Sequence, residues 1–528
     1  MAHSTPGSSA ESGPGGSASG GRPGGRQGRG SVVGTPSHRW WVLAVIGVAQ
    51  LMVILDATIV NIALPSAQTD LHFNDGNRQW IVTAYALAFG SLLLFGGRLA
   101  DLIGRKVTFL IGLVGFAVAS AIGGAAPSFE VLVTARALQG MFGALLAPAA
   151  LSLLTTTFTV PKERAKAFGI YGAIAGAGGA VGLLLGGVLT EYLNWRWCLY
   201  VNLLFALVAF LGGLRLLSPG GRPAKPHLDI PGTVLVSAGL FCIVYGFSNA
   251  EQHDWGSTGT WGFLAAGAIL LIAFARWQVR AQHPVLPPRV VADRDRSASY
   301  LAMFISGAGM FGVFLFLTYY LQQSLNYSPV QTGLAFLPMV LLIMATSVTT
   351  TNVLVPKLGA KPIVPTGMLL SCGAMAWLTA LDRNSTYAAH VLPPTLVLGL
   401  GLGLIFATAM NLATAGVEPH DAGVASAMVN TSQQVGGSIG TSLLNTLATS
   451  AAASYLSGKQ HTPAVLAQSQ LHSYTVAYWW SAALFAVGFV ATFLLYRSGL
   501  PRSLQSPPVQ QGEDAAAADT SAARTTGG

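Results

Sequence analysis

Long apolar runs separated by short polar loops fill most of this chain of 528 residues. Only 9% of the residues are charged, whereas soluble domains carry about 25%. A soluble protein this apolar could not cover its own surface with polar groups. The sequence therefore predicts an all-α polytopic membrane protein, in which each apolar run crosses a hydrocarbon core about 30 Å thick as one helix.

Fourteen such runs lie between two polar tails. Their approximate ranges are 40–64, 80–98, 107–126, 129–155, 166–189, 198–217, 231–249, 259–277, 299–321, 329–352, 362–381, 391–416, 423–448 and 475–496. Residues 1–38 are mainly Gly, Ser, Pro and Arg, and residues 499–528 are also of low complexity. Segments of this composition bury too little apolar area to offset the entropy of ordering, so we predict two disordered cytoplasmic tails.

The basic residues follow the positive-inside rule. With the N-terminus in the cytoplasm, the outside holds only Arg78, Arg196, Arg383 and Lys459. We therefore expect both termini in the cytoplasm and the spans in the cell (inner) membrane of a bacterium. The net charge of +9 comes from scattered loop residues, which argues against a nucleic-acid partner. Frequent Gly, Ala and Arg indicate a GC-rich genome, such as that of an actinobacterium.

A weak internal repeat indicates two related halves. The stretch Leu99–Lys106 aligns with Leu354–Lys361 at an offset of 255 residues, and each stretch joins the second and third spans of a six-span group. Internal repeats of this kind are typical of transporters. We therefore predict an N-terminal six-helix bundle over residues 39–217 and a C-terminal six-helix bundle over residues 299–498. A linker over residues 218–298 then carries two extra helices.

Two charges lie deep inside predicted spans, and a charge at the centre of a membrane helix costs about 2.5–3.5 kcal/mol on insertion scales. The rise of an α-helix puts Asp56 and Arg136 at similar depths, so that they can pair. One interpretation is a proton switch, in which protonation of Asp56 releases Arg136. The other is a structural ion pair.

The residues also exclude several kinds of chemistry. We find no Walker A motif, no metal-ligand cluster and no paired intramembrane carboxylates, and the three cysteines form no CxxC pair. We therefore predict no enzymatic activity, no metal and no cofactor, and an ion gradient as the source of energy.

Three motifs together resemble the major facilitator superfamily and, within it, the drug:H⁺ antiporters with fourteen spans. They are Leu55–Pro65, Gly97–Lys106 and Arg136–Gly140, and the segment Trp195–Asn202 is also similar to this subfamily. The resemblance implies two pseudo-symmetric six-helix bundles with alternating access, and proton coupling at Asp56 and Arg136. It also implies a cytoplasmic latch made of Gly97, Arg98, Asp101, Gly104, Arg105 and Lys106. Asp101 is expected to face the start of the span that begins near Ala422, where free N–H groups carry partial positive charge.

The fifth span carries a glycine stripe. Gly178, Gly182, Gly186 and Gly187 lie at spacings that let another helix approach closely, and they resemble the antiporter motif of this subfamily. We predict a closely packed interface that can slide. The family usually has a proline, which bends the helix, where this chain has Leu183.

The sequence therefore predicts proton-coupled export, that is drug:H⁺ antiport, of small amphiphilic molecules such as antibiotics by a monomer in lipid, giving resistance or self-resistance. Since Asp56 is the only acid deep in a span, we expect neutral, zwitterionic or monocationic substrates. Candidate cavity residues are Thr58, Asn61, Tyr85, Gln139, Tyr320, Gln322, Asn430 and Gln434. One alternative is an importer or uniporter of a small metabolite. A more remote one is a membrane-embedded sensor or enzyme.

Overall fold

The computed structural model describes residues 36–74, 76–158, 160–218, 229–253, 255–417, 421–460 and 462–497. Every regular element in these ranges is a helix, which confirms the predicted all-α class. Fourteen of the described helices have 19 residues or more, and each overlaps one predicted span. Ten helical segments are long and apolar enough to cross a membrane by length and composition.

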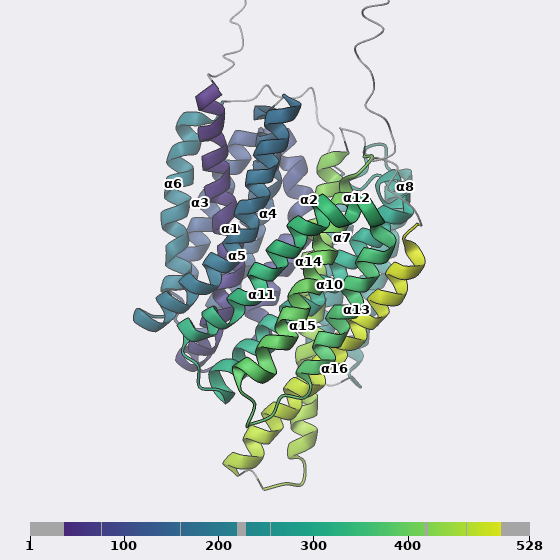
Figure 1. Cartoon of the computed structure of the whole chain (residues 1–528). Helices are drawn as coiled ribbons and strands as arrows, with labels where there is room; N and C mark the ends of the chain where they lie inside the picture. Colours follow the sequence, from purple (N-terminus) through teal and green to yellow (C-terminus); the bar gives the residue numbers. More distant parts are fainter. Residues whose placement is uncertain are drawn as a thin grey trace, which may run out of the picture.

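The first six helices form one bundle, and the last six long helices form a second (Figure 1). The first bundle consists of α1 (Pro36–Leu71), α2 (Gln79–Ile103), α3 (Arg105–Gly124), α4 (Phe129–Thr157), α5 (Pro161–Tyr192) and α6 (Trp197–Leu216). The second consists of α10 (Arg294–Tyr319), α11 (Pro329–Thr349), α13 (Ala360–Leu378), α14 (Leu392–Thr414), α15 (Ala422–Leu456) and α16 (Pro463–Leu495). We call these bundles the N-half and the C-half.

The packing of the two halves repeats. In the N-half α1 packs against α5 and α6, and in the C-half α10 packs against α15 and α16 in the same way. The turns at the aligned repeat also match, because Gly104 has a φ of 98° and Gly359, 255 residues further on, has a φ of 73°. Glycine adopts this left-handed backbone region without the steric cost that a side chain would add. The predicted internal repeat is therefore confirmed in the backbone.

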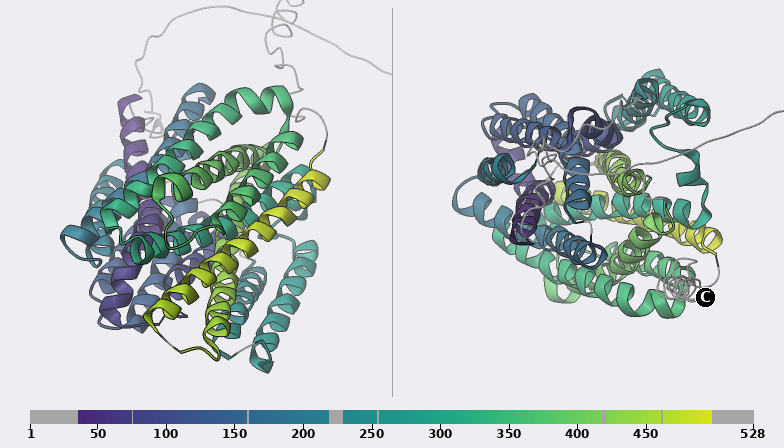
Figure 2. Two further views of the ribbon diagram at one scale, coloured as in Figure 1. Left: turned by 60° about the horizontal axis from the view of Figure 1, so that its bottom comes forward. Right: turned by 90° about the horizontal axis from the view of Figure 1, so that it is seen from above.

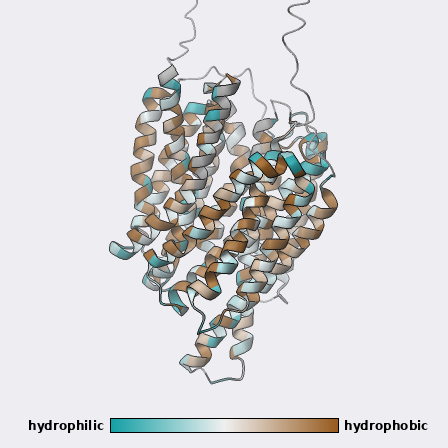
Figure 3. Cartoon of the chain, viewed as in Figure 1, coloured by the Kyte–Doolittle hydropathy of each residue, from teal (hydrophilic) through white to brown (hydrophobic). Residues whose placement is uncertain are grey.

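α1 begins and α16 ends at the same end of the molecule (Figure 1). We call this the cytoplasmic end, following the charge pattern of the loops, and the opposite end, with residues 125–128 and 193–196, the outer end. Hydrophobic residues occupy much of the length of the helices (Figure 3), and many large apolar side chains are exposed on their outward faces. Examples are Leu204, Leu207 and Leu211 on α6, and Val487, Val490 and Leu494 on α16. This surface suits lipid rather than water.

Three shorter π-helical segments and two short helices complete the C-half and its connection. These are η1 (Tyr320–Ser324), η2 (Thr350–Leu354), η3 (Tyr387–Val391), α9 (Pro288–Ala292) and α12 (Val355–Leu358). The sequence does not predict α9, which begins at the second of two adjacent prolines in a segment interpreted as linker. The predicted tails lie outside the described residues except at 36–38, where α1 already begins.

The ends of α15 and α16 differ from prediction. α15 continues to Leu456 rather than ending at 448, and α16 begins at Pro463 rather than at 475. The side chain of Thr462 accepts a hydrogen bond from the backbone N–H of Val465 and so caps α16 early. These extra turns contain too many polar residues to be recognised as membrane-spanning. They project as a helical hairpin beyond the other helices at the outer end (Figure 1).

The two extra helices, α7 (Ile230–His253) and α8 (Thr258–Arg280), pair with each other beside both halves (Figure 2). α7 packs against α2 of the N-half and α15 of the C-half. Ser237 donates a hydrogen bond to the carbonyl of Ser91 in α2, and Thr446 of α15 donates one to the carbonyl of Phe247. We call this pair the inserted hairpin.

Asp229 holds the base of the inserted hairpin together. Its carboxylate accepts hydrogen bonds from Trp277 Nε1 at 2.7 Å, from Gln278 Nε2 at 2.8 Å and from the backbone N–H groups of Gly232 and Val285. Burial acts to raise the pKa of Asp229, but these hydrogen bonds outweigh it and lower the pKa below its ordinary value. The ionised carboxylate is therefore the form that the fold stabilises.

We expect Asp229→Ala to destabilise the inserted hairpin by about 1.5–3 kcal/mol, the range for a hydrogen bond to a charged group. Because the pKa is lowered on folding, this contribution is present at neutral pH and is lost as pH falls below about 4. Thermal unfolding of the purified protein in detergent, followed by tryptophan fluorescence, measures it. Asp229→Asn, which keeps one acceptor oxygen, should lose less. Equal unfolding temperatures for all three proteins at pH 7 would contradict this role.

Candidate functional site

Asp56 of α1 and Arg136 of α4 form an ion pair inside the N-half. Arg136 Nη1 lies 2.6 Å from Asp56 Oδ2, and the side chains are 2% and 0% exposed. The pairing expected from their matched depths is therefore confirmed as a contact. Each charge offsets the desolvation of the other, so removal of either leaves an uncompensated buried charge.

Three further polar side chains complete the site. Asp56 Oδ1 accepts hydrogen bonds from Gln139 Nε2 at 2.9 Å and from Asn202 Nδ2 at 2.7 Å. Gln139 in turn accepts a bond from Arg136 Nη1 at 2.9 Å and donates one to Ser120 Oγ at 2.8 Å. We call these five residues, from α1, α3, α4 and α6, the Asp56 cluster. Gln139, predicted as a cavity residue, lies in this cluster.

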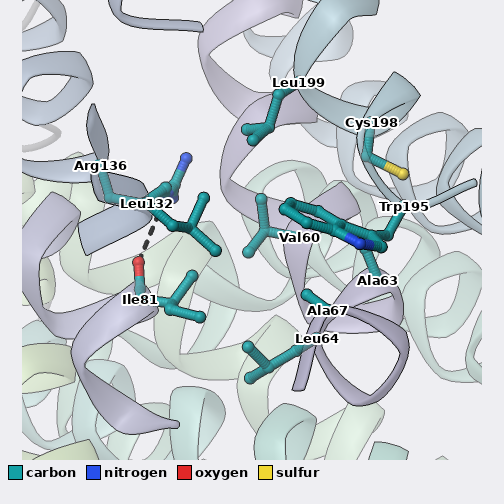
Figure 4. A pocket seen from close by; sticks show the side chains of 10 residues that line it. All are labelled: Val60, Ala63, Leu64, Ala67, Ile81, Leu132, Arg136, Trp195, Cys198 and Leu199. Atoms are coloured by element: carbon teal, nitrogen blue, oxygen red, sulfur yellow. Dashed lines mark hydrogen bonds between the residues drawn. The ribbon is translucent and has the colours of Figure 1, made fainter. Parts of the chain in front are cut away.

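Arg136 is fixed on its other sides by α2. Its Nε donates to the carbonyl of Ile81 at 3.1 Å (Figure 4), and its guanidinium carbon lies 4.5 Å from the ring centroid of Tyr85. Tyr85, also predicted as a cavity residue, is only 2% exposed. An aromatic face stabilises a cation most where water is excluded. The positive charge of Arg136 is therefore stabilised by protein groups rather than by solvent.

The glycines of α5 allow close packing against two neighbouring helices, α1 and α11. Gly178 and Gly182 lie against α1, and a Cβ added at Gly186 would lie 2.8 Å from Ile59 of the same helix. A Cβ at Gly187 would instead meet Pro329 of α11 in the C-half at 2.7 Å. The stripe is therefore a packing surface toward both halves, and whether it slides stays a prediction.

α5 and α11 cross closely near the outer end. A Cβ added at Gly333 of α11 would lie 2.6 Å from the carbonyl oxygen of Leu183. Leu183 stands at the position of the family's usual proline, and α5 runs through it as one uninterrupted helix. The crossing of α5 and α11 therefore rests on backbone-to-backbone contact.

Arg78 joins the halves at the outer end. It is 3% exposed, its Nε donates to Asn445 Oδ1 of α15 at 3.1 Å, and its guanidinium lies 4.4 Å from the ring centroid of Tyr319. Gln322, predicted as a cavity residue, donates to the carbonyl of Ile62 at 3.1 Å across the same boundary. We call Arg78, Asn445, Tyr319 and Gln322 the outer latch. The charge pattern predicts Arg78 only as a residue of an outer loop, although an arginine directly before a span on the arginine-poor side is a usable signal of a role at that end.

Arg78→Leu should open the outer latch more often, because a desolvated cation–π contact and a hydrogen bond to a charged group are lost together. With about 2 kcal/mol for such a contact, an increase of about tenfold or more in outside access is expected. The measurement is the rate at which a membrane-impermeant maleimide labels Ser442→Cys in a variant whose three native cysteines are replaced. Arg383→Leu, on the same side, is the control. Equal labelling rates with and without Arg78→Leu would contradict the role of these residues in holding the outer end closed.

The eight predicted cavity residues do not form one group. The side chains of Thr58 and Asn61 donate to carbonyls of their own helix, at Ile54 and Ala57. Tyr320 donates to the carbonyl of Asp382 in the outer loop at 2.9 Å. Gln139 lies in the Asp56 cluster, Tyr85 packs against Arg136, and Gln322 belongs to the outer latch. The other two predicted cavity residues are on α15. They are Asn430, which is exposed, and Gln434, which lies beside α2.

The cytoplasmic loop motif is described only in part. The side chains of Arg98 and Asp101 lie outside the described residues, so the predicted contact with the start of α15 stays a prediction. Gly97 lies near α4, Gly104 makes the turn described above, and Arg105 opens α3. Lys106 Nζ donates to the carbonyl of Leu214 at 2.9 Å, at the end of α6.

A different charged contact is described at the start of α15. Asp421, whose side chain is 6% exposed, pairs with Arg289 of α9 at 2.5 Å. Arg296 of α10 donates to the carbonyls of Val290 and Ala415. The short helix α9, which the sequence did not predict, thus contacts the residue directly before α15.

Known proteins share this architecture. The model of the Major Facilitator Superfamily matches residues 46–441. A bacterial homolog of the human lysosomal transporter Spinster, solved in an inward-facing and occupied conformation, has the same fold with a TM-score of 0.64 at 15% identity. The match covers 90% of this chain and 100% of that one.

Relatives from actinobacteria are much closer in sequence. The puromycin resistance protein of Streptomyces alboniger is 51% identical over 86% of this chain and 90% of its own length. The cephamycin export protein of Amycolatopsis lactamdurans is 39% identical over 76% and 83%, and the tetracenomycin C resistance and export protein of Streptomyces glaucescens is 34% identical over 78% and 77%. The chain belongs to the major facilitator superfamily, among its actinobacterial membrane transporters.

Proposed function

We propose that this protein exports small amphiphilic organic molecules, antibiotics among them, across the cell membrane in exchange for protons. The observation that carries the proposal is the buried pair of Asp56 and Arg136. A charge kept at such depth is a functional site by default, since apolar packing would be cheaper. The names of the relatives, which concern resistance to and export of antibiotics, support the choice of substrate and of direction.

The exchange would work through the charge of Asp56. With Asp56 ionised, Arg136 is satisfied and α1 is bound to α4. A proton on Asp56 neutralises the carboxylate, so that Arg136 loses its partner and the contact between α1 and α4 weakens. Because α1 also touches α10 and α11 of the C-half, a shift of α1 reaches the boundary between the halves. Substrate and proton would bias the same two-state equilibrium in opposite directions.

The energy would come from the proton gradient, with no bound cofactor, and the working unit would be a monomer in lipid. A substrate with no charge or one positive charge fits best, because Asp56 is the one acid of the site and is already paired. A dication would need a second carboxylate to offset its desolvation.

The test is accumulation of puromycin and a panel of other antibiotics in an efflux-deficient bacterium. Cells that make the protein should accumulate several-fold less of at least one compound than cells with an empty vector, and a protonophore should abolish the difference. Immunodetection of the protein in the membrane fraction controls for expression. Equal accumulation of every compound, or a difference that the protonophore leaves unchanged, would count against proton-driven export.

A further inference from the structure

Asn202 of α6 is the member of the Asp56 cluster with unused hydrogen-bonding capacity. It is fully buried, and its Nδ2 donates to Asp56 Oδ1 at 2.7 Å. Its own Oδ1 is buried and has no hydrogen-bond partner among the described residues. A buried acceptor without a donor is costly, which points to a donor that arrives in another state of the protein.

The donor that arrives in the other state is the proton itself. A carboxylate only accepts hydrogen bonds, whereas a protonated carboxyl group has an O–H that needs an acceptor. The other acceptors of the cluster are already engaged, since Gln139 Oε1 accepts from Arg136 and Ser120 Oγ accepts from Gln139. Asn202 Oδ1 is therefore the side-chain acceptor of the cluster that carries no hydrogen bond in this state.

We propose that Asn202 is a positioning residue that serves Asp56 in both charge states, donating to the carboxylate and accepting from the protonated acid. A half-turn of its amide about the Cβ–Cγ bond exchanges Nδ2 and Oδ1, which have nearly the same shape. The acceptor then stands where the donor stands now, against the oxygen of Asp56. Before the half-turn Oδ1 has no partner, and after it Nδ2 has none. The number of unsatisfied amide atoms is therefore the same in both states. The inference rests on the proposed proton coupling at Asp56.

Space for the partner change lies next to the cluster. A small cavity, with room for about one water molecule, is bordered by Arg136 on one side and by Cys198 and Trp195 on the other (Figure 4). Leu199 also borders the cavity. Cys198 and Leu199 lie one turn before Asn202 in α6. A shift of the guanidinium off Asp56 would be directed toward this cavity, while the amide of Asn202 takes over the neutral carboxyl group.

Asn202→Leu removes both functions and keeps the branched shape of the side chain. Because a hydrogen bond to a charged group is stronger than one between neutral groups, the carboxylate loses more than the acid does. The pH of half-maximal transport should therefore move to more alkaline values, by about one unit. Asn202→Asp puts a second carboxylate beside Asp56, and two carboxylates in contact retain a shared proton, so its shift should be larger in the same direction.

The measurement uses inside-out membrane vesicles energised by respiration. Puromycin and ethidium serve as probes, and proton release on addition of each probe is followed with a pH-sensitive dye between about pH 5.5 and 9. The matched control is Asn249→Leu, the same change at an amide of the inserted hairpin that donates to Thr260 Oγ1. Its pH profile should coincide with that of the wild type.

The outcomes separate this inference from the proposed function. If Asp56→Asn abolishes probe-linked proton release but Asn202→Leu and Asn202→Asp keep the wild-type pH profile, the role of Asn202 is refuted and the proton site stands. If Asp56→Asn retains probe-linked proton release, proton coupling at Asp56 fails independently of Asn202. If Asn202→Leu does not reach the membrane, Asn202→Asp decides, because it keeps size and polarity. Loss of transport at every pH with an intact fold would also overturn the role in both charge states.

Discussion

Replacement of Asp56 by Asn is expected to reduce proton-driven export to the background of cells without the protein. The asparagine has the same shape and can still bond to Gln139 and Asn202. It leaves Arg136 without its counter-charge, so we expect a protein that is less stable but still folds and reaches the membrane. It cannot take up a proton at physiological pH, and the charge change that releases Arg136 is then lost. Accumulation of puromycin with and without a protonophore gives the readout.

A second assay separates lost coupling from lost binding. Exchange of labelled for unlabelled puromycin across vesicles needs no net proton movement, so it should continue in the Asp56→Asn protein. If export in this variant remains sensitive to the protonophore, the coupling proton binds at a residue other than Asp56. Loss of exchange as well as export would indicate that Asp56 contributes to binding of the substrate.

Arg136→Leu should destabilise the protein by about 3–5 kcal/mol, because it leaves Asp56 buried and without its counter-charge. Asp56→Asn in the same chain removes the stranded charge, so the double variant should recover most of this loss without recovering export. Unfolding of the four purified proteins in detergent forms a double-mutant cycle. Destabilisation that is merely additive in the double variant would mean that the two charges do not stabilise each other.

Much of the fold was predictable because hydropathy and loop charge are local properties of the chain. The fourteen long helices, the internal repeat at Gly104 and Gly359, and the pair of Asp56 and Arg136 all followed from composition, spacing and helix rise. The outer turns of α15 and α16 did not, because a polar helix beyond the membrane has no apolar signal. Their ends are set by a cap at Thr462 and by mutual packing.

The site was predictable only in part, for a different physical reason. Asn202 and Arg78 acquire their roles from partners that are 146 and 367 residues away, and no local pattern identifies such partners. The cavity residues were chosen for polarity, yet a polar side chain in a membrane helix often bonds to its own backbone, as Thr58 and Asn61 do. Polarity in a span therefore predicts a bonded side chain more reliably than it predicts a ligand contact.

The inserted hairpin makes the two flanks of the transporter unequal. A protein of two halves presents two boundaries to the bilayer, here between α2 and α15 and between α5 and α11. The first is backed by α7 over Leu87, Val236, Leu240, Val244 and Val435, and the second has no such backing in the described residues. Acyl chains and ions are thus kept from one flank by a third layer of protein. The opposite flank borders the lipid directly, and its helices cross with their backbones in contact at Gly187 and Gly333.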